Sequence, residues 1–433
     1  MGAVKFAVCQ TRLATAQAPA DPHSDLAAIA GVSSITFGED VVYFGTGASW
    51  DQFRDGAGSA RARLAFREHP ESIQRENLHV VVQKGRLFQL EHPEVSVLVD
   101  KGRFLLVDLE PKDASKLGKS DIPCYSVQPL SSLPPMESGE GHRRVFEAAR
   151  RPAALVPDPT IQALVDRISR QTYEADLTHL VAFNTRNSTS AQFAAACDFV
   201  DGQLAALGYV TSRQTIQVSG SPSENVIALR DGSGPASRET VLVSAHLDSI
   251  NLQGNIASPA PGADDDGSGS AGVIEIARAL KDHQGVHDLQ LVLFGGEEQG
   301  LFGSKQFVAT LTEAKRAKLR AVVHMDMIAS LNSASPTVLL EGAPVSQAVI
   351  DGLSAAASTY TGLAVQTSLN PFNSDHVPFI RKNVPAVLTI EGTDDANDAI
   401  HSPRDTLDRI NFDLALEILR MNTAFVVDSL IRP

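Results

Sequence analysis

Short, almost uniformly apolar runs recur through the second half of the chain, including TVLVSAH, LQLVLF, RAVVHMD and PAVLTIEG. Strands that are apolar on both faces are typical of parallel sheets, because helices cover both sides of such sheets. The segments between the runs have helical spacing, as at Val273, Ile276, Ala277 and Leu280. From about residue 159 onward, the sequence therefore predicts a three-layer α/β fold with a mostly parallel or mixed sheet and helices on both faces.

The first part of the chain has a different pattern. Residues 32–130 contain short alternating or β-branched runs that are broken by turn residues. Residues 131–158 are rich in Pro, Ser, Gly and charged residues, which is typical of a linker. We therefore expect a small strand-rich domain over 1–130, a linker over 131–158 and the α/β domain over 159–433.

Ionisable side chains follow the apolar runs at the points where the strands should end. In open α/β sheets, ligands bind outside the carboxyl ends of the strands. Each residue alone is ordinary in a polar loop, and three aspartates between glycines are common in a turn. Their joint placement after almost every core strand favours a functional site. The set is His246, Asp248, Asp264, Asp265, Asp266, Glu297, Glu298, Asp326 and His401.

The chemistry of this set indicates metal binding. Two histidines and several carboxylates, without cysteine, suit a zinc-type divalent ion with an open coordination position. The excess of carboxylates suggests two ions that share one bridging aspartate of the triplet. Two such ions, about 3.5–4 Å apart, can bind a hydroxide between them and polarise a carbonyl.

Six motifs occur in order between residues 244 and 411: SAHLDS, APGADDDGSGSAGV, GGEEQGLFGS, HMDMI, NSDHVPF and IHSPRDTLDRI. Their order and spacing resemble the M28 family of two-zinc aminopeptidases, and a compatible helix and strand pattern extends over roughly 159–433. The resemblance implies a zinc-exopeptidase fold and a metal-dependent hydrolase that removes amino-terminal residues from peptides. The first 150 residues lie outside it and could be a propeptide-like regulator or an accessory scaffold for substrate access.

The resemblance also implies a ligand set. His246 and Asp326 would hold one zinc, Glu298 and His401 would hold the other, and Asp265 would bridge both. Cobalt or manganese could fit similar ligands.

Residues beside the ligands receive supporting roles by the same resemblance. The link from Asp265 to Asp266 would be the family's cis peptide bond. Asp264, to which the resemblance assigns no role, is expected to be a helper or a solvated neighbour. Glu297 would act as the general base toward the bridging zinc-hydroxide nucleophile. Asp248 would orient the imidazole of His246.

The sequence departs from some members of the family near the site. Those members have a tyrosine that helps to hold the tetrahedral intermediate, whereas Ile400 precedes His401 here and SLNPFN precedes the SDH motif. The oxyanion donor is therefore not assigned. His324 is expected to be a buried neighbour. His376 is expected in the first turn of a helix capped by Ser374, and whether it or Asp375 lines the pocket stays open.

Other functions remain as alternatives. A carboxypeptidase, or a dipeptidase or amidase of the same fold, is one; a carboxypeptidase needs a cation for the substrate carboxylate, for which Arg381, Lys382 and Arg404 are candidates. A glutaminyl cyclase of this fold would lack the full two-metal set. A catalytically inactive binding or receptor-like module would be expected to have lost ligands or the base.

Charge and composition limit the partners. The net charge of −14 disfavours nucleic acid and anionic membranes, and no apolar run approaches the roughly 18 residues of a membrane span. We expect a peptide or small amide substrate; oligomeric state is not predicted. The resemblance suggests a secreted or periplasmic protein. A cytoplasmic protein is the alternative, because the apolar stretch in the first 24 residues is too interrupted for a convincing signal peptide.

Cys197 is expected to be a core residue on a helical stripe.

Overall fold

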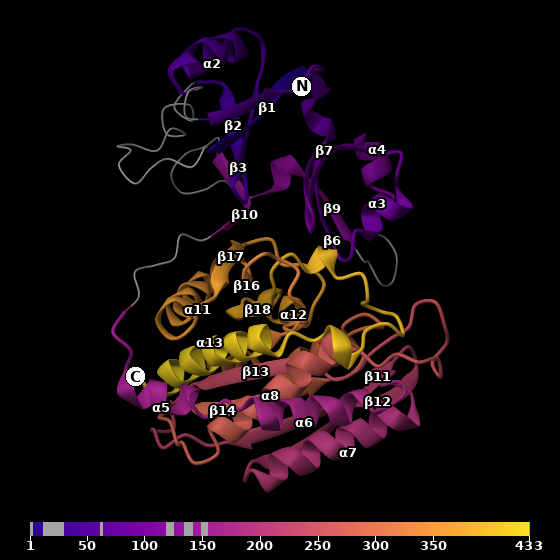
Figure 1. The fold of residues 1–433 in the computed structure, drawn as a ribbon, viewed down its shortest axis with the longest axis vertical. Coiled ribbons are helices and arrows are strands. Elements are labelled where there is room, and N and C mark those ends of the chain that lie inside the picture. The colour runs from indigo at the N-terminus through magenta and orange to yellow at the C-terminus, as the bar shows by residue number, and fades with distance from the viewer. Residues whose placement is uncertain are drawn as a thin grey trace. The chain divides into compact units, whose positions relative to one another are not determined.

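The computed structural model describes residues 3–11, 30–60, 64–117, 125–133, 142–148 and 155–432. The chain divides into two compact units, one of Met1–Ala148 with Ser368–Asn370 and one of Ala149–Thr367 with Pro371–Pro433 (Figure 1). Most of the amino-terminal segment considered for a signal lies outside the described residues.

The first unit is rich in strands, as predicted. One of its sheets has the strand order β10 (His142–Ala148), β2 (Val32–Phe37), β3 (Asp40–Gly45), β1 (Ala3–Thr11) and β4 (Leu64–Glu68), and β5 (Ile73–Gln74) also pairs with β1. Helix α2 (Gly47–Ala60) contributes Trp50 and Phe53 to a core cluster with Tyr43 of β3. Buried aromatic side chains contribute strongly to the stability of a core.

A second sheet of this unit has the order β7 (Ser96–Lys101), β8 (Phe104–Asp108), β6 (Leu78–Gln83) and β9 (Tyr125–Pro129). The short helices α3 (Leu87–Glu91) and α4 (Pro111–Ala114) accompany it. Its core contains Val81, Phe88 and Leu105.

The segment expected to be a linker contains strand β10. Val145 and Phe146 of this strand are buried, and β10 pairs in parallel with β2. The enrichment in Pro, Ser and Gly that suggested a linker lies in the earlier part of 131–158, of which residues 134–141 are outside the described part of the chain.

The second unit contains a mixed sheet. Its order is β11 (Val210–Val218), β12 (Ser221–Arg230), β14 (Asp288–Phe294), β13 (Thr240–His246), β15 (Leu319–Met325), β18 (Ala386–Glu391), β16 (Thr337–Glu341) and β17 (Ala364–Ser368). Strands β14, β13, β15 and β18 run parallel to one another, whereas β11, β12 and β16 pair antiparallel with their neighbours.

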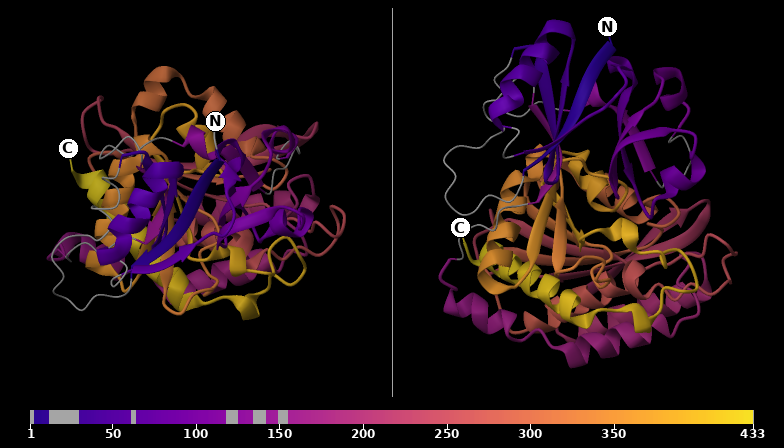
Figure 2. Two further views of the ribbon diagram at one scale, coloured as in Figure 1. Left: turned by 90° about the horizontal axis from the view of Figure 1, so that it is seen from above. Right: turned by 45° about the horizontal axis from the view of Figure 1, so that its top comes forward.

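Helices cover both faces of this sheet, so the three-layer expectation is confirmed. One side carries α6 (Arg170–Val181), α7 (Ala191–Ala206), α8 (Gly269–Ala279), α11 (Gln347–Tyr360) and α13 (Phe412–Ile431), with α5 (Pro159–Val165) packed against α13. Figure 2 shows α13, in yellow, running along the sheet. Cys197 of α7 is buried, as predicted.

The other face packs against α9 (Phe302–Thr310) and α12 (His376–Ile380), while α10 (Glu313–Ala317) leads into β15. Alternate strand residues such as Leu242 and Val322 join Phe307 and Phe379 of these helices in one core cluster. Their neighbours in sequence face α8 and α13, because side chains alternate along a strand. Among the described residues, no helix combines the length and apolar character that crossing a bilayer requires.

The parallel strands end together at one edge of the sheet. In their register, His246 at the end of β13 pairs with Phe294 at the end of β14, and Met325 at the end of β15 pairs with Thr389 of β18. Residues that follow these ends therefore converge, as expected from their positions in the sequence.

Candidate metal centre

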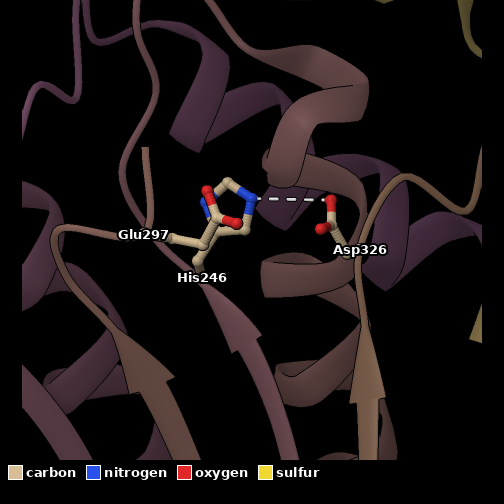
Figure 3. Close-up of side chains that lie close together, drawn as sticks. All are labelled: His246, Glu297 and Asp326. Carbon is tan, nitrogen blue, oxygen red and sulfur yellow. Dashed lines mark ion pairs between the residues drawn. The ribbon is translucent and has the colours of Figure 1, made fainter. Parts of the chain in front are cut away.

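Two groups of potential ligand atoms lie at the convergent strand ends. His246, Glu297 and Asp326 form one group, and Asp265, Glu298 and His401 form the other, with the ligand atoms within each group lying no more than 4.8 Å apart. Figure 3 shows the first group, in which His246 Nε2 is 3.5 Å from Asp326 Oδ1. All the metal-ligand candidates named from the sequence are thus brought together.

Asp265 lies between the two histidines. Its Oδ1 is 3.1 Å from His246 Nε2, and its Oδ2 is 3.1 Å from His401 Nε2. His401 Nε2 is also 3.1 Å from Glu298 Oε2. One carboxylate therefore presents a different oxygen to each group, which is the geometry expected of a bridging ligand.

The donor atoms fit a divalent metal. Nε2 of His246, Nε2 of His401 and both oxygens of Asp265 are buried, and within the described chain none makes a hydrogen bond of acceptable geometry. Buried polar atoms are almost always satisfied, so these atoms imply a missing partner. Imidazole nitrogens and carboxylate oxygens without thiolates are a donor set that zinc accepts.

Charge at the centre supports the same conclusion. Burial raises the pKa of Asp265, but the contacts with His246 and His401 outweigh it and hold that pKa below its ordinary value. Burial lowers the pKa of both histidines, yet the surrounding carboxylates raise it well above the usual value. Without metal, the carboxylates thus favour protonation of the same histidine side chains that would coordinate an ion.

The imidazole of His246 is oriented by its other nitrogen. Nδ1–H donates to the main-chain oxygen of Asp248 at 3.1 Å, and this bond directs Nε2 toward the site. The Asp248 carboxylate is farther from Nδ1, at 3.6 Å, and accepts the main-chain N–H groups of Glu297 at 3.2 Å and Glu298 at 3.1 Å. Asp248 therefore links the loops that carry His246 and the two glutamates.

The aspartate triplet splits into three environments. The peptide bond between Asp265 and Asp266 is cis. Asp266 accepts the main-chain N–H groups of His246 at 3.1 Å and Met327 at 3.3 Å. Asp264 is fully buried, and it accepts hydrogen bonds from Ala329 N–H and Asn397 Nδ2, so it is not a solvated neighbour.

Ser374 contacts a predicted metal ligand and does not cap the helix. Its hydroxyl donates to Asp326 Oδ2 at 2.6 Å and lies 3.0 Å from His324 Nε2. The cap of α12 is Asp375, so the expected Ser374 cap is wrong, because Asp326 takes the hydroxyl. His324 is buried, as predicted.

The residues at the start of α12 are also buried. Burial raises the pKa of Asp375 to about 7, and its carboxylate accepts the hydroxyl of Ser304. His376 Nε2 lies 3.6 Å from Glu341 Oε1.

Two supporting residues were missed from the sequence. Asp405 accepts main-chain N–H groups of the triplet. Arg186 is fully buried, and its guanidinium donates to the carbonyls of Leu247 and Gly262 at 2.8 Å each. Asp405 stands in a quoted motif but nothing local indicates its partners, and Arg186 lies outside all six motifs.

Comparison with known proteins identifies the relatives of this site. Residues 225–426 match the model of peptidase family M28. Leupeptin-inactivating enzyme 1 of Streptomyces exfoliatus is 30% identical over 259 residues, which are 57% of this chain and 55% of that protein. Leucine aminopeptidase 1 of Arthroderma otae is 25% identical over 303 residues, or 65% of this chain and 79% of that protein. The chain thus spans about half the length of the first of these relatives.

Solved structures share the fold. The LapA aminopeptidase of Legionella pneumophila has a TM-score of 0.57 at 18% identity, covering 82% of this chain and 98% of that one. BSAP, a zinc aminopeptidase from Bacillus subtilis, has a TM-score of 0.53 at 16% identity, covering 61% of this chain and 96% of that one.

Proposed function

We propose that this chain, which belongs to peptidase family M28 through residues 225–426, is a zinc-dependent aminopeptidase with two metal positions. The position of Asp265 carries the proposal, because its two oxygens lie 3.1 Å from the Nε2 atoms of His246 and His401. A single-metal site has no need of one carboxylate turned toward two histidines.

The ligands divide between the two positions as their contacts suggest. His246 with Asp326 would hold one zinc, Glu298 with His401 would hold the other, and Asp265 would serve both. When bound, zinc would polarise the scissile carbonyl and lower the pKa of a water molecule.

Glu297 is assigned as the general base. Its main-chain N–H is held by Asp248, and its carboxylate lies in the group with His246 and Asp326. The neighbouring Glu298 makes the contact with His401. A carboxylate placed beside the ligands can take a proton from the attacking water and deliver it to the leaving amine.

An aminopeptidase fits the charges better than a carboxypeptidase. Surplus buried carboxylates suit the positive α-amino group of an aminopeptidase substrate. One of the relatives, leucine aminopeptidase 1 of Arthroderma otae, is by its name an enzyme that acts on such substrates. The cations considered for a substrate carboxylate do not converge on the centre. Arg404 is 3.0 Å from Asp398, whereas Arg381 and Lys382 are exposed after the far end of α12.

The complete set of candidate ligands and base disfavours the inactive binding module and the glutaminyl cyclase. In the proposed assignment, each ligand position and the base has a residue of the required type, and an inactive binding module or a single-metal cyclase of this fold would not require all of them. A folded chain that is insensitive to chelator and hydrolyses none of the substrates would support the binding module.

The test is a substrate panel of aminoacyl anilides, their N-acetylated versions, and dipeptides with free or blocked carboxyl groups, each with and without chelator. We expect chelator-sensitive hydrolysis of the free-amine substrates, independent of the carboxyl group. Equal hydrolysis of free and acetylated anilides would refute the aminopeptidase assignment.

We also propose that residues 159–433 carry the catalysis and that residues 1–130 are a regulator or scaffold. Cleaving the full chain within 131–158 separates the two roles. A rise in activity identifies a regulator that inhibits, and unchanged activity rejects inhibition.

A further inference from the structure

One carboxylate receives two consecutive backbone groups of the aspartate triplet. Asp405 Oδ1 accepts the N–H of Asp264 at 2.9 Å, and its Oδ2 accepts the N–H of Asp265 at 3.0 Å. The main-chain oxygen of Asp405 accepts the N–H of Ala263 at 3.2 Å. Asp405 is only 2% exposed, so water does not compete effectively for these bonds.

Asp405 belongs to the loop that carries His401. Its own N–H donates to Ser402 O at 3.4 Å, and the Ser402 hydroxyl donates to Ala399 O at 2.6 Å. His401 itself has a φ of +54°, an unfavourable conformation for a residue with a side chain, so contacts of the loop must maintain it. The loop that supplies one histidine is therefore bonded directly to the segment that supplies the proposed bridge.

The side chain of Asp265 contacts the two histidines that it faces, each at 3.1 Å. Neither carboxylate oxygen makes a hydrogen bond of acceptable geometry with a described residue. Facing both histidines at once therefore depends on the position of its backbone, whose N–H donates to Asp405 at 3.0 Å. Earlier in the same segment, Arg186 donates to the carbonyl of Gly262 at 2.8 Å.

We propose that Asp405 is a positioning residue of the metal centre, which holds the backbone of Asp265 so that its two oxygens face His246 and His401 at once. This inference rests on the proposed function, because it assumes that Asp265 bridges two ions. Loss of the bond pair would let Asp265 turn, and the ion held with His401 and Glu298 would bind more weakly.

The variant D405N tests this role with little change in size. An amide offers one acceptor oxygen, and its NH2 group would face the N–H of Asp264 or Asp265, so one of the two bonds is lost. D408N is the matched control, because Asp408 lies three residues along the same loop and is exposed, and its carboxylate accepts the Thr406 hydroxyl at 2.6 Å.

Zinc binding to the full chain is measured by equilibrium dialysis, and the Co²⁺-substituted protein is compared by visible absorption. Circular dichroism and thermal unfolding of the metal-free chain report the fold. We expect D405N to bind at least one ion about 10- to 100-fold more weakly, with an altered Co²⁺ spectrum, while D408N matches the wild type. Wild-type zinc affinity and Co²⁺ spectrum in folded D405N would overturn the proposal.

D405E provides a second measurement if D405N does not fold. It keeps the charge and both acceptors but moves them by one methylene, so we expect weaker zinc binding than in the wild type. A D405E protein with lower thermal stability and unchanged zinc affinity would show a purely structural role and overturn the proposal. Zinc affinity is measured without substrate. If the wild type hydrolyses none of the substrates, the proposed function is refuted, but the zinc measurements still test the role of Asp405.

Discussion

The carboxylate of Asp266 accepts the main-chain N–H of His246 at 3.1 Å. Its other oxygen accepts the N–H groups of Gly269 at 2.9 Å and Met327 at 3.3 Å. One buried side chain thus ties the ends of β13 and β15 to the start of α8. The strand ends are held in place by the residue next to the proposed bridge, and the bridge itself is left to face the metal site.

Replacing Asp266 should therefore damage the fold before it damages chemistry. D266A leaves three buried N–H groups without their acceptor, at about 1–3 kcal/mol each, so we expect a loss of at least ~3 kcal/mol in the free energy of unfolding. Urea unfolding of the metal-free chain measures it. A loss below about 1 kcal/mol would contradict this account of Asp266.

Asp265 and Asp264 should respond in opposite ways. D265A removes the atoms that face both histidines, so we expect a folded chain that loses zinc. D264N keeps the metal ligands but weakens the contacts of Asp264 with Ala329 and Asn397, so we expect retained zinc and a lower unfolding temperature. Zinc content after gel filtration distinguishes them; equal zinc in both variants would refute the bridging role of Asp265.

Glu297 should be needed for turnover but not for metal binding. E297Q keeps the size of the side chain and removes its ability to take a proton. We expect retained zinc and a kcat lower by at least about 10²-fold, as for a lost general base. Steady-state kinetics alongside zinc analysis provide the measurement, and near-normal turnover would exclude Glu297 as the base.

Removing metal should weaken the fold as well as stop the reaction. Ions that bind only the folded chain stabilise it by mass action, by about 2.7 kcal/mol when the free ion is at 100 times its dissociation constant. We expect chelator to lower the unfolding temperature and added zinc to restore it. The same treatment of D265A serves as the control, because that variant should show little response to zinc.

Cys197 should be inert in the native chain. Burial raises the pKa of its thiol, so almost no reactive thiolate forms at neutral pH. Alkylation followed by peptide mapping should label Cys197 only after unfolding. Labelling of the native chain at a rate comparable to that of the unfolded chain would show that α7 does not keep this residue in the core.

The sequence predicted the parts of the molecule that depend on periodicity. Apolar runs placed β13, β14, β15 and β18, and parallel strands bring their following residues to one edge, so His246, Glu298 and Asp326 could be expected to meet. Asp405 could not be assigned in this way, because its partner Asp264 lies 141 positions away and no repeat connects them.

Ser374 illustrates a different limit. A serine before a short helix usually caps it, but here its hydroxyl donates to Asp326, 48 positions away. The hydroxyl of Ser374 binds this buried carboxylate and does not cap the helix. The contact arises from the packing of α12 against β15, which the local sequence does not indicate. Arg186 was missed for a similar reason, since its bonds are to main-chain carbonyls, which carry no side-chain signature.

The three neighbouring carboxylates of residues 264–266 face three different parts of the site: the loop after β15, the proposed metal centre and the strand ends. Their assignments depend on where each residue falls along the backbone. A one-residue deletion within the triplet would therefore reassign every role at once, and no single compensating substitution elsewhere would restore them. We expect this segment to tolerate a changed side chain far better than a changed length.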